Sequence, residues 1–318
     1  MRIVVLDGHT LDPGDNPWTD IEAQGELTVS DRTPPDKILE RALPADIILT
    51  NKTALTAETL SKLPNLKFIA VLATGFNVVD VAAARRLGVP VSNVPEYGTD
   101  SVAQFVFALL LELCHRVGLH DTSVKRGDWA ASPDFCYWKT PLMELAGRTM
   151  GLVGFGRIGR RVGTLAHAFG MKVIAYDAVG GADPGFAPFQ WVSRLEVFRQ
   201  ADVVSLHCPQ TADNQRFVDR ALLAQMRRQA LFLNTARGGL VNEADLAEAL
   251  NADRIAGAAV DVVSTEPIRA DNPLLKAKNC LITPHQAWAT LSARNRLMKT
   301  TAENIAAFLA GKPIHVVN

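Results

Sequence analysis

The stretch "GLVGFGRIG", residues 151–159, decides the fold of this chain. An apolar segment leads into its glycines, and an amphipathic segment, "RIGRRVGTLAHAFG", begins inside it. Gly154, Gly156 and Gly159 have the G-x-G-x-x-G spacing with which a strand turns into a helix around a pyrophosphate. The first glycine allows the tight turn, the second leaves room for phosphates, and the third lets helix and strand approach closely. The same spacing occurs in ordinary helix-packing turns, but the strand before it and the helix after it favour dinucleotide binding.

The segment after this helix bears on which dinucleotide is bound. "KVIAYD" is typical of a strand and ends in Asp177, 18 residues after Gly159. A carboxylate at this place accepts hydrogen bonds from the adenosine ribose and repels a 2′-phosphate. No arginine lies between residues 178 and 186 to pair with such a phosphate. The sequence therefore favours NAD over NADP.

Strand-like and helix-like segments alternate on both sides of the glycine turn. The strand-like segments are short, rich in Ile and Val, and bounded by Gly, Asn or Thr. Alternation of this kind predicts an α/β fold with parallel sheets covered by helices. The other predicted strands are 2–8, 45–51, 66–75, 89–94, 201–209, 230–236, 255–263 and 279–285, and the predicted helices include 34–43, 56–63, 80–88 and 243–254.

The length of 318 residues predicts two domains rather than one. An apolar stretch that begins at Thr99 or Asp100 predicts a long buried helix between them. The last helix-like stretch can return to the first domain, which would make that domain discontinuous. We therefore expect a substrate domain formed by residues 1–98 and 287–318, and a dinucleotide-binding domain formed by residues 99–286.

Composition argues against several other classes of protein. Lys and Arg together number 33, as do Asp and Glu. The chain therefore has no excess of positive charge that would attract nucleic acid or an anionic membrane. The first apolar run breaks at Asp7, too early for a signal peptide, and the run 102–114 is too short to span a bilayer. The four cysteines are scattered, which predicts neither a disulfide framework nor a metal site and fits the cytoplasm.

In residues 121–145 the apolar residues do not recur with the period of a helix or a strand. They contain Trp129, Tyr137 and Trp138. One interpretation is a packed surface loop, and the other is an arm whose aromatic side chains form a subunit interface. Both stay open at this point.

Three chemically active side chains each follow a predicted strand of the second series. They are Arg237, Glu266 and His285. The carboxyl ends of parallel strands line the ligand crevice of a doubly wound sheet. Taken singly, the arginine can be a solvated loop residue, the glutamate a turn residue before Pro267, and the histidine a structural residue. Together, at one edge beside a nicotinamide site, they indicate catalysis.

These residue types suit hydride transfer to a 2-keto acid. The transfer leaves negative charge on the carbonyl oxygen, and a charged histidine is the natural proton donor near neutral pH. A carboxylate beside the imidazole favours that charged form. An arginine can hold a substrate carboxylate and the carbonyl oxygen with a fork of donors that lysine lacks. We therefore expect Arg237 to be the substrate clamp, with Gly238 and Gly239 keeping the turn slim enough for substrate to approach.

The sequence resembles the D-isomer-specific 2-hydroxyacid dehydrogenases over essentially its whole length. The resemblance rests on "GLVGFGRIG", "SLHCPQT", "LNTARGGLV", "AGAAVDVVSTEP" and "TPHQAWAT", in this order. It implies two Rossmann-like domains, a flavodoxin-like substrate domain and an NAD-binding domain, with the active site in the interdomain cleft and a homodimer as the assembly. It also implies Arg237 as substrate binder, Glu266 as partner of His285, and His285 as the acid/base.

The same resemblance implies further contacts. "LATGFNVVD" resembles the loop whose backbone amides, here those of Thr74 and Gly75, bind the substrate carboxylate. Asp261 is implied to bind the nicotinamide carboxamide, although a helix cap or turn residue would look the same. The implied cofactor contacts are Thr99, Gly154, Gly156, Arg157, Ile158, Gly159, Asp177, Cys208, Pro209, Thr235, Ala236 and Asp261.

Within the family, "NVPEYGTDSVAQ", "SPDFCYW" and "HQAWAT" are most similar to bacterial glycerate (hydroxypyruvate) dehydrogenases. That branch implies that Trp288 and Trp138 shape the substrate pocket, Trp138 from the same or the other subunit. Gln286 departs from its pattern, which has an apolar residue there, and Gly239 replaces a common proline. Hydroxypyruvate or glyoxylate is the expected keto acid, and Gln286 can either alter that preference or point away from the pocket.

Two alternatives to this function stay open. A non-catalytic NAD(H)-sensing interaction protein would not need the intact set of Arg237, Glu266 and His285, and no long disordered tail is present to recruit partners. Another D-2-hydroxyacid dehydrogenase would act on D-lactate, D-3-phosphoglycerate or a branched keto acid. A phosphorylated substrate calls for basic residues, which 73–80 lacks, and we expect no regulatory domain after residue 318.

Overall fold

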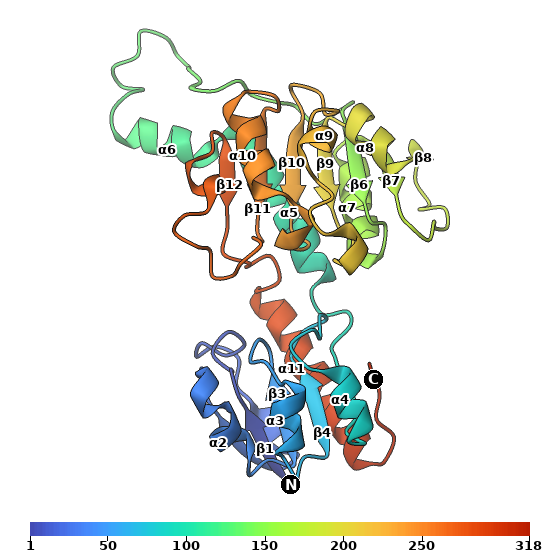
Figure 1. The fold of residues 1–318 in the computed structure, drawn as a ribbon. Coiled ribbons are helices and arrows are strands. Elements are labelled where there is room, and N and C mark those ends of the chain that lie inside the picture. Colours follow the sequence, from blue (N-terminus) through green and yellow to red (C-terminus); the bar gives the residue numbers. More distant parts are fainter. The chain divides into compact units, whose positions relative to one another are not determined.

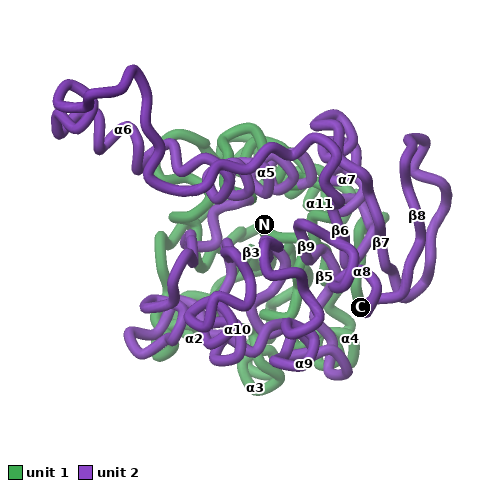
Figure 2. The backbone as a smooth tube through the Cα atoms, turned by 90° about the horizontal axis from the view of Figure 1, so that it is seen from above, with its two compact units in different colours: residues 1–98, 288–318 green, residues 99–287 purple.

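The computed structural model describes residues 1–318 and divides them into two compact units. Unit 1 consists of residues 1–98 and 288–318, and unit 2 of residues 99–287 (Figure 2). Each unit is built on its own parallel sheet. Two parallel-sheet α/β domains, as predicted from the alternating segments, are therefore confirmed.

The sheet of unit 1 has five parallel strands in the order β2-β1-β3-β4-β5. Its central strands are buried on both faces, which is why they have continuous apolar sequences instead of an alternating pattern. The chain winds outward in both directions from β1 and β3, as in a doubly wound fold. The strands are β1 (Arg2–Val5), β2 (Glu26–Val29), β3 (Ile47–Thr50), β4 (Phe68–Val71) and β5 (Val91–Ser92).

Helices cover both faces of this sheet. One face packs against the C-terminal helix, where Phe308 stacks on Phe68 with ring centroids 4.5 Å apart. The opposite face packs against three short helices through small and aliphatic residues such as Leu60 and Ala84. The helices of unit 1 are α1 (Thr19–Glu22), η1 (Pro35–Lys37), α2 (Ile38–Ala42), α3 (Ala57–Ser61), α4 (Val81–Arg86) and α11 (Leu291–Leu309).

The sheet of unit 2 has seven parallel strands in the order β12-β11-β10-β9-β6-β7-β8, visible across the upper part of Figure 1. The chain order reverses between β6 and β9, and in open α/β sheets such a switch point is where ligands bind, outside the carboxyl ends of the strands. The strands are β6 (Thr149–Val153), β7 (Lys172–Tyr176), β8 (Phe189–Trp191), β9 (Val203–Leu206), β10 (Leu231–Asn234), β11 (Gly257–Val260) and β12 (Cys280–Ile282).

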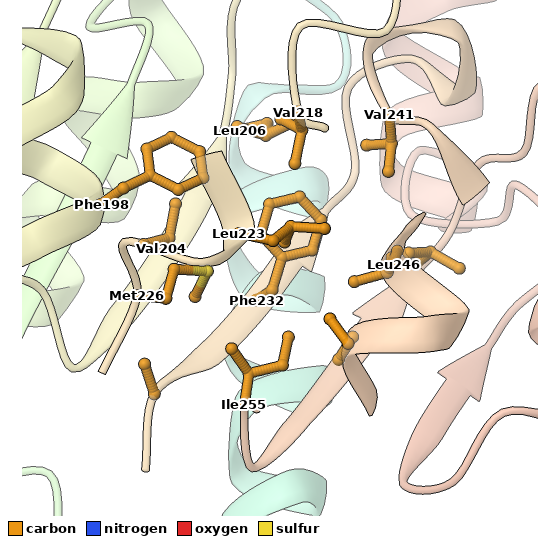
Figure 3. Packing of buried hydrophobic residues seen from close by; sticks show 14 of the residues in the cluster. Phe198, Val204, Leu206, Val218, Leu223, Met226, Phe232, Val241, Leu246 and Ile255 are labelled. Atoms are coloured by element: carbon orange, nitrogen blue, oxygen red, sulfur yellow. The ribbon is translucent and has the colours of Figure 1, made fainter. Parts of the chain in front are cut away.

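Two helical layers enclose this second sheet. One face packs against α5 and α7, and the other packs against α8, α9 and α10. Figure 3 shows the second of these cores, in which Phe198 and Phe232 lie among aliphatic side chains. The helices of unit 2 are α5 (Thr99–His115), α6 (Val117–Lys125), α7 (Arg157–Ala168), α8 (Arg194–Gln200), η2 (Ala212–Asn214), α9 (Arg220–Leu223), η3 (Gly238–Leu240), α10 (Glu243–Asn251) and η4 (Pro273–Lys276).

Helix α5 is the long apolar helix that the sequence predicts. Side chains such as Val106 and Leu110 are fully buried against the sheet of unit 2. The helix ends before Arg116, which has a positive φ of 48°, and α6 begins at once. No single helix has the length and apolar character needed to cross a membrane, although α5 and α6, bent by 53°, pass that test of length and composition together.

The structure differs from the predicted elements at identifiable places. The sequence does not predict the edge strands β2 and β8, because their side chains are half-buried or exposed and they show no continuous apolar run. The segment 121–145 is not wholly irregular, since its first residues complete α6. Helix α10 ends at Asn251 instead of residue 254, and Asp253 just beyond it has a positive φ of 50°.

Candidate active site

The three glycines of the 151–159 turn meet different surroundings. Gly154 has φ +96°, and a Cβ there would collide with the backbone of His207 and Cys208. A Cβ at Gly159 would collide with the carbonyl oxygen of Gly154, so the start of α7 lies directly against the turn. A Cβ at Gly156 would meet nothing within 4 Å. The turn is therefore tight on the side of the sheet and open at Gly156, as a pyrophosphate requires.

The start of α7 and the end of β7 complete this cradle. Gly156 is the N-cap of α7 and supplies no side chain to cap it, so the helix end can receive an anion. The carboxylate of Asp177 accepts a hydrogen bond from the amide of Phe155 at 2.7 Å and from that of Val179 at 3.1 Å. The negative side chain is thus fixed against the glycine turn, at the place where a ribose is expected. The residues present fit a dinucleotide.

The segment after β9 crosses over Gly154. Burial lowers the pKa of His207 to about 3, so its imidazole is neutral near pH 7, and it lies 2.9 Å from the hydroxyl of Ser205. Burial also raises the pKa of Cys208 to about 11, which keeps this side chain a thiol. Pro209 follows on the exposed side. This places Cys208, one of the predicted cofactor contacts, beside the glycine turn, with Pro209 as the next residue.

Arg237 lies in the turn that follows β10. The buried side chain of Asn234 fixes this turn, because its Nδ2 donates to the carbonyl of Arg237 at 2.9 Å and its Oδ1 accepts from the amide of Ala236 at 3.0 Å. The Arg237 side chain itself is exposed, and one Nη donates to the Ala236 carbonyl at 2.7 Å. Thr235 Oγ1 is buried without a hydrogen-bond partner in the chain. Sequence reasoning missed Asn234, whose only signal was a polar residue at the end of a buried strand.

The two glycines after Arg237 serve a purpose that we did not expect. A Cβ at Gly238 would collide with the backbone of Val263 and Ser264, and one at Gly239 would come within 2.5 Å of the Gln210 side chain. The space beside Gly238 is therefore occupied by the segment that leads to Glu266, and that beside Gly239 by a side chain. The glycines allow parts of the chain itself to pack together, and the expectation that they also make room for substrate stays a prediction.

Glu266 and His285 form a direct pair. The carboxylate of Glu266 lies 2.7 Å from Nδ1 of His285, and the two side chains are 35% and 27% exposed. Because Glu266 is an acceptor, the Nδ1 atom carries the proton in this pair, which leaves Nε2 for exchange with a substrate. His285 has a positive φ of 52°, a conformation that non-glycine residues rarely adopt and that recurs at functional sites.

Asp261 holds the turn that carries His285. It is 1% exposed, and its carboxylate accepts from the hydroxyl of Thr283 at 2.6 Å and from the amides of Gln286 and Ala287 at 2.9 Å each. Its carbonyl accepts from the His285 amide at 2.8 Å. Burial raises the pKa of Asp261, while the hydrogen bonds act in the opposite direction. Its contact with the nicotinamide stays a prediction, and the Gln286 side chain is exposed.

Glu243 is a second residue that sequence reasoning missed. Its carboxylate accepts from the amide and hydroxyl of Ser264 at 2.6 and 2.7 Å and from Asn272 at 3.0 Å. Ser264 lies two residues before Glu266. The first residue of α10 thus fixes the loop that positions the carboxylate beside His285. No sequence signal identifies it, because it looks like an ordinary acidic residue in a first helical turn.

In unit 1, Thr74 and Gly75 follow β4 in an exposed loop. The Thr74 hydroxyl donates to the carbonyl of Val94 at 2.8 Å, and the Thr74 carbonyl accepts from Asn93 at 2.7 Å. The backbone amides of Thr74 and Gly75 make no hydrogen bond to the chain, so both can donate to a ligand. Trp288 packs edge-on against Tyr97, with ring centroids 6.1 Å apart.

The remaining predicted site residues are spread over unit 2. Thr99 is the first residue of α5, and Ile158 lies in the first turn of α7. Trp138 is 65% exposed in the arm that follows α6, which projects from the rest of unit 2 in Figures 1 and 2. Arg237, Glu266 and His285 follow the neighbouring strands β10, β11 and β12 at the same edge of the sheet. Of these three, the structure shows a direct bond between Glu266 and His285.

Comparison with known proteins agrees with this geometry. The family model "D-isomer specific 2-hydroxyacid dehydrogenase, NAD binding domain" matches residues 107–287, all within unit 2. Hydroxypyruvate reductase of Blautia hydrogenotrophica is 49% identical, with 100% of each chain covered, and glycerate dehydrogenase of Methylorubrum extorquens is 41% identical over 89% of this chain and 88% of its own. A solved acyclic imino acid reductase in complex with NADPH and D-Arg has a TM-score of 0.88 at 31% identity, with 100% of each chain covered. The chain belongs to the D-isomer-specific 2-hydroxyacid dehydrogenases, enzymes whose cofactor is NAD.

Proposed function

We propose that this dehydrogenase interconverts hydroxypyruvate and D-glycerate, with glyoxylate as a second keto acid. The relatives at 49% and 41% identity are named for the hydroxypyruvate and glycerate sides of that reaction. The observation that carries the proposal is the 2.7 Å contact between Glu266 and His285, at the sheet edge where Arg237 also lies. A binding protein without catalysis has no need for a histidine held by a carboxylate in this way.

In the reductive direction we assign the proton to His285. Nε2 of the charged imidazole donates it to the carbonyl oxygen of the keto acid, and Glu266 stabilises the positive ring through Nδ1. NADH, when bound, supplies the hydride for C2 of the keto acid. In the oxidative direction the neutral imidazole takes the proton back from the hydroxyl group.

Arg237 and the loop after β4 are assigned to substrate binding. The guanidinium of Arg237 offers several N–H groups in one plane, so that it can bind the carbonyl oxygen and a carboxylate oxygen together. The amides of Thr74 and Gly75 are proposed to bind the substrate carboxylate, and their lack of acceptors in the chain supports this. Trp288 and Trp138 are proposed to limit the size of the C3 substituent.

We assign cofactor binding to the cradle of unit 2. The first amides of α7, including those of Arg157 and Ile158, suit the pyrophosphate, and Asp177 suits the adenosine ribose. Thr235 Oγ1, which lacks a partner in the chain, supports a contact on the nicotinamide side. The other proposed contacts are Thr99, Gly154, Gly156, Gly159, Cys208, Pro209, Ala236 and Asp261.

We also propose a cytoplasmic homodimer. All four cysteines are free thiols, which suits a reducing compartment. The arm that follows α6 exposes several large apolar side chains, among them Phe135 at 90% exposure. Exposed apolar groups gathered on a projecting segment are typical of a surface that another subunit covers.

A substrate panel tests the proposed function. NADH oxidation at neutral pH would be followed with hydroxypyruvate, glyoxylate, pyruvate, phosphohydroxypyruvate and a branched keto acid. We expect the highest kcat/KM with hydroxypyruvate and the next with glyoxylate. A higher kcat/KM with the phosphorylated or branched acid would contradict the hydroxypyruvate assignment and indicate another substrate class within the family. If none of these keto acids is reduced although NADH binds, the result would favour a non-catalytic NAD(H)-sensing protein.

A further inference from the structure

A chain of hydrogen bonds joins the C-terminal tail to the loop that follows β4. Nδ1 of His315 lies 2.8 Å from Oδ1 of Asn304, and Nδ2 of Asn304 donates to the carbonyl of Asn93 at 2.9 Å. Nδ2 of Asn93 in turn donates to the carbonyl of Thr74 at 2.7 Å. All of these residues belong to unit 1.

The two asparagines in this series of hydrogen bonds are buried, and Asn93 is held on both sides. Asn304 is 0% exposed and Asn93 is 9% exposed. The amide of Asn93 donates to the carbonyl of His315 at 3.2 Å, so the tail holds Asn93 on one side while Asn304 holds it on the other. The tail is tied to β5 as well, since the amide of Val317 donates to the carbonyl of Val91 at 2.8 Å.

The bond from Asn93 has a direct geometric consequence for the next amide. In a planar trans peptide, the carbonyl of one residue and the N–H of the following residue point in opposite directions. Asn93 holds the Thr74 carbonyl toward the interior of unit 1, and the N–H of Gly75 is therefore aimed away from it. That N–H makes no bond within the chain and faces outward for a ligand.

We propose that Asn93 is a positioning residue for substrate binding, fixed in place by Asn304 and His315. It acts by setting the orientation of the Thr74–Gly75 peptide, which presents its N–H group to the carboxylate of the keto acid. The inference rests on the proposed function in one respect, namely that these amides bind the substrate carboxylate. It does not depend on which 2-keto acid is used, because all of them have that carboxylate.

The expected effect is specific to keto acid binding. Asn93→Ala leaves the Thr74 carbonyl without its Asn93 donor and lets the peptide rotate, which should raise KM about 10- to 100-fold. Asn93→Asp keeps the size of the side chain but replaces the donor with a charged acceptor, and should raise KM at least as much. The dissociation constant of NADH should stay unchanged, because its proposed contacts lie in unit 2.

Asn16 provides a matched control. It is also a buried asparagine of unit 1, 5% exposed, and its Nδ2 donates to the carbonyl of Leu11 at 2.9 Å, away from the Thr74 loop. Asn16→Ala should lower the melting temperature without changing KM. His315→Ala offers a milder change at an exposed residue that should fold in any case, and removing this outer link should raise KM about 2- to 10-fold.

The experiment measures KM and kcat for hydroxypyruvate, the Kd of oxamate for the NADH-loaded enzyme, the Kd of NADH, and the melting temperature. Oxamate is used because it presents the carboxylate without being reduced. A rise in KM and in the oxamate Kd at unchanged NADH affinity supports the inference. Unchanged oxamate affinity in Asn93→Ala and His315→Ala, or a similar loss in Asn16→Ala, overturns it.

These readouts also separate this inference from the proposed function. If no keto acid is reduced but oxamate binds to the wild type and binds weakly to Asn93→Ala, the proposed function fails while the positioning role stands. If hydroxypyruvate is reduced and the Asn93 variants bind it normally, the proposed function stands while the positioning role fails. A wild type that does not bind oxamate overturns the positioning role directly.

Discussion

His285 shows how single residues are constrained at the catalytic edge. Its backbone has a φ of 52°, which costs a non-glycine residue about 1–3 kcal/mol and must be offset by neighbouring contacts. Asp261 supplies these contacts, because its carboxylate and carbonyl bind the residues on both sides of the turn. Glu266 then fixes the ring at 2.7 Å. The imidazole is thus oriented before any substrate arrives.

Asp177 is the residue that should determine the choice of dinucleotide. We expect Asp177→Ala to raise kcat/KM with NADPH relative to NADH by about 10- to 100-fold, because the charge that repels a 2′-phosphate is removed. The affinity for NADH should fall as well, since Asp177 also holds the Phe155 amide of the glycine turn. Steady-state kinetics with both cofactors measure the ratio.

Asp183→Ala is the control, because Asp183 lies in the exposed loop after β7 and its carboxylate accepts from the amide of Gly185 at 2.8 Å, not from the glycine turn. It should leave the ratio of the two cofactors unchanged. An unaltered ratio in Asp177→Ala would mean that the ribose is recognised by another residue.

At the scale of elements, the loop after β10 and the loop after β11 pack so closely that Gly238 has no room for a side chain. We expect Gly238→Ala to destabilise the fold by about 1–3 kcal/mol, because the new Cβ would displace the backbone of Val263 and Ser264. The displacement should also lower kcat, since the same segment carries Glu266. Urea denaturation and steady-state kinetics measure the two effects.

Gly118→Ala is the matched control for that substitution. Gly118 lies in α6, and a Cβ there would meet nothing within 4 Å. Alanine should therefore stabilise the helix by up to about 1 kcal/mol. If Gly238→Ala were as stable and active as Gly118→Ala, the close packing of the two loops would be refuted.

His207, which directly follows β9, should make the free energy of unfolding depend on pH. The pKa of His207 is lowered to about 3 in the fold, against an ordinary value of 6.5, so below pH 6.5 the unfolded chain binds more protons there. The contribution of His207 to stability is therefore fully present above pH 6.5 and declines as the pH falls toward 3. At pH 5 the loss should be about 1–2 kcal/mol. Urea denaturation of the wild type and His207→Gln should show a smaller decline between pH 7 and pH 5 in the variant, whereas equal declines would contradict the shifted pKa.

Features that depend on neighbouring residues in the sequence can be predicted from it, whereas features that depend on residues far apart in the sequence cannot. The glycine turn and the buried strands are local patterns, so the parallel sheets and the edge that carries Arg237, Glu266 and His285 could be predicted. The edge strands β2 and β8 have no apolar pattern and could not. Asn93 and Glu243 act through residues 19 and 21 positions away, and no local pattern marks such partners.

At the scale of the whole molecule, the arm after α6 should decide the assembly. We expect the wild type to sediment with twice the mass of one chain, because side chains such as Phe135 and Trp138 are largely exposed in the single chain. Phe135→Ser should shift the enzyme toward monomer at micromolar concentrations. Val179→Ser, which changes a 92% exposed apolar residue outside the arm, should not. A monomeric wild type in sedimentation equilibrium would refute the dimer.

The most direct test of the central claim is the turnover of His285→Gln with NADH and hydroxypyruvate. Glutamine keeps much of the size of the ring but cannot exchange a proton, so kcat should fall by about 10²- to 10⁴-fold while the NADH dissociation constant stays within a few-fold of the wild type. His167→Gln, at an exposed histidine of α7, should retain full activity. A His285→Gln enzyme with normal kcat would contradict the account, and loss of NADH binding instead of turnover would make His285 a structural residue.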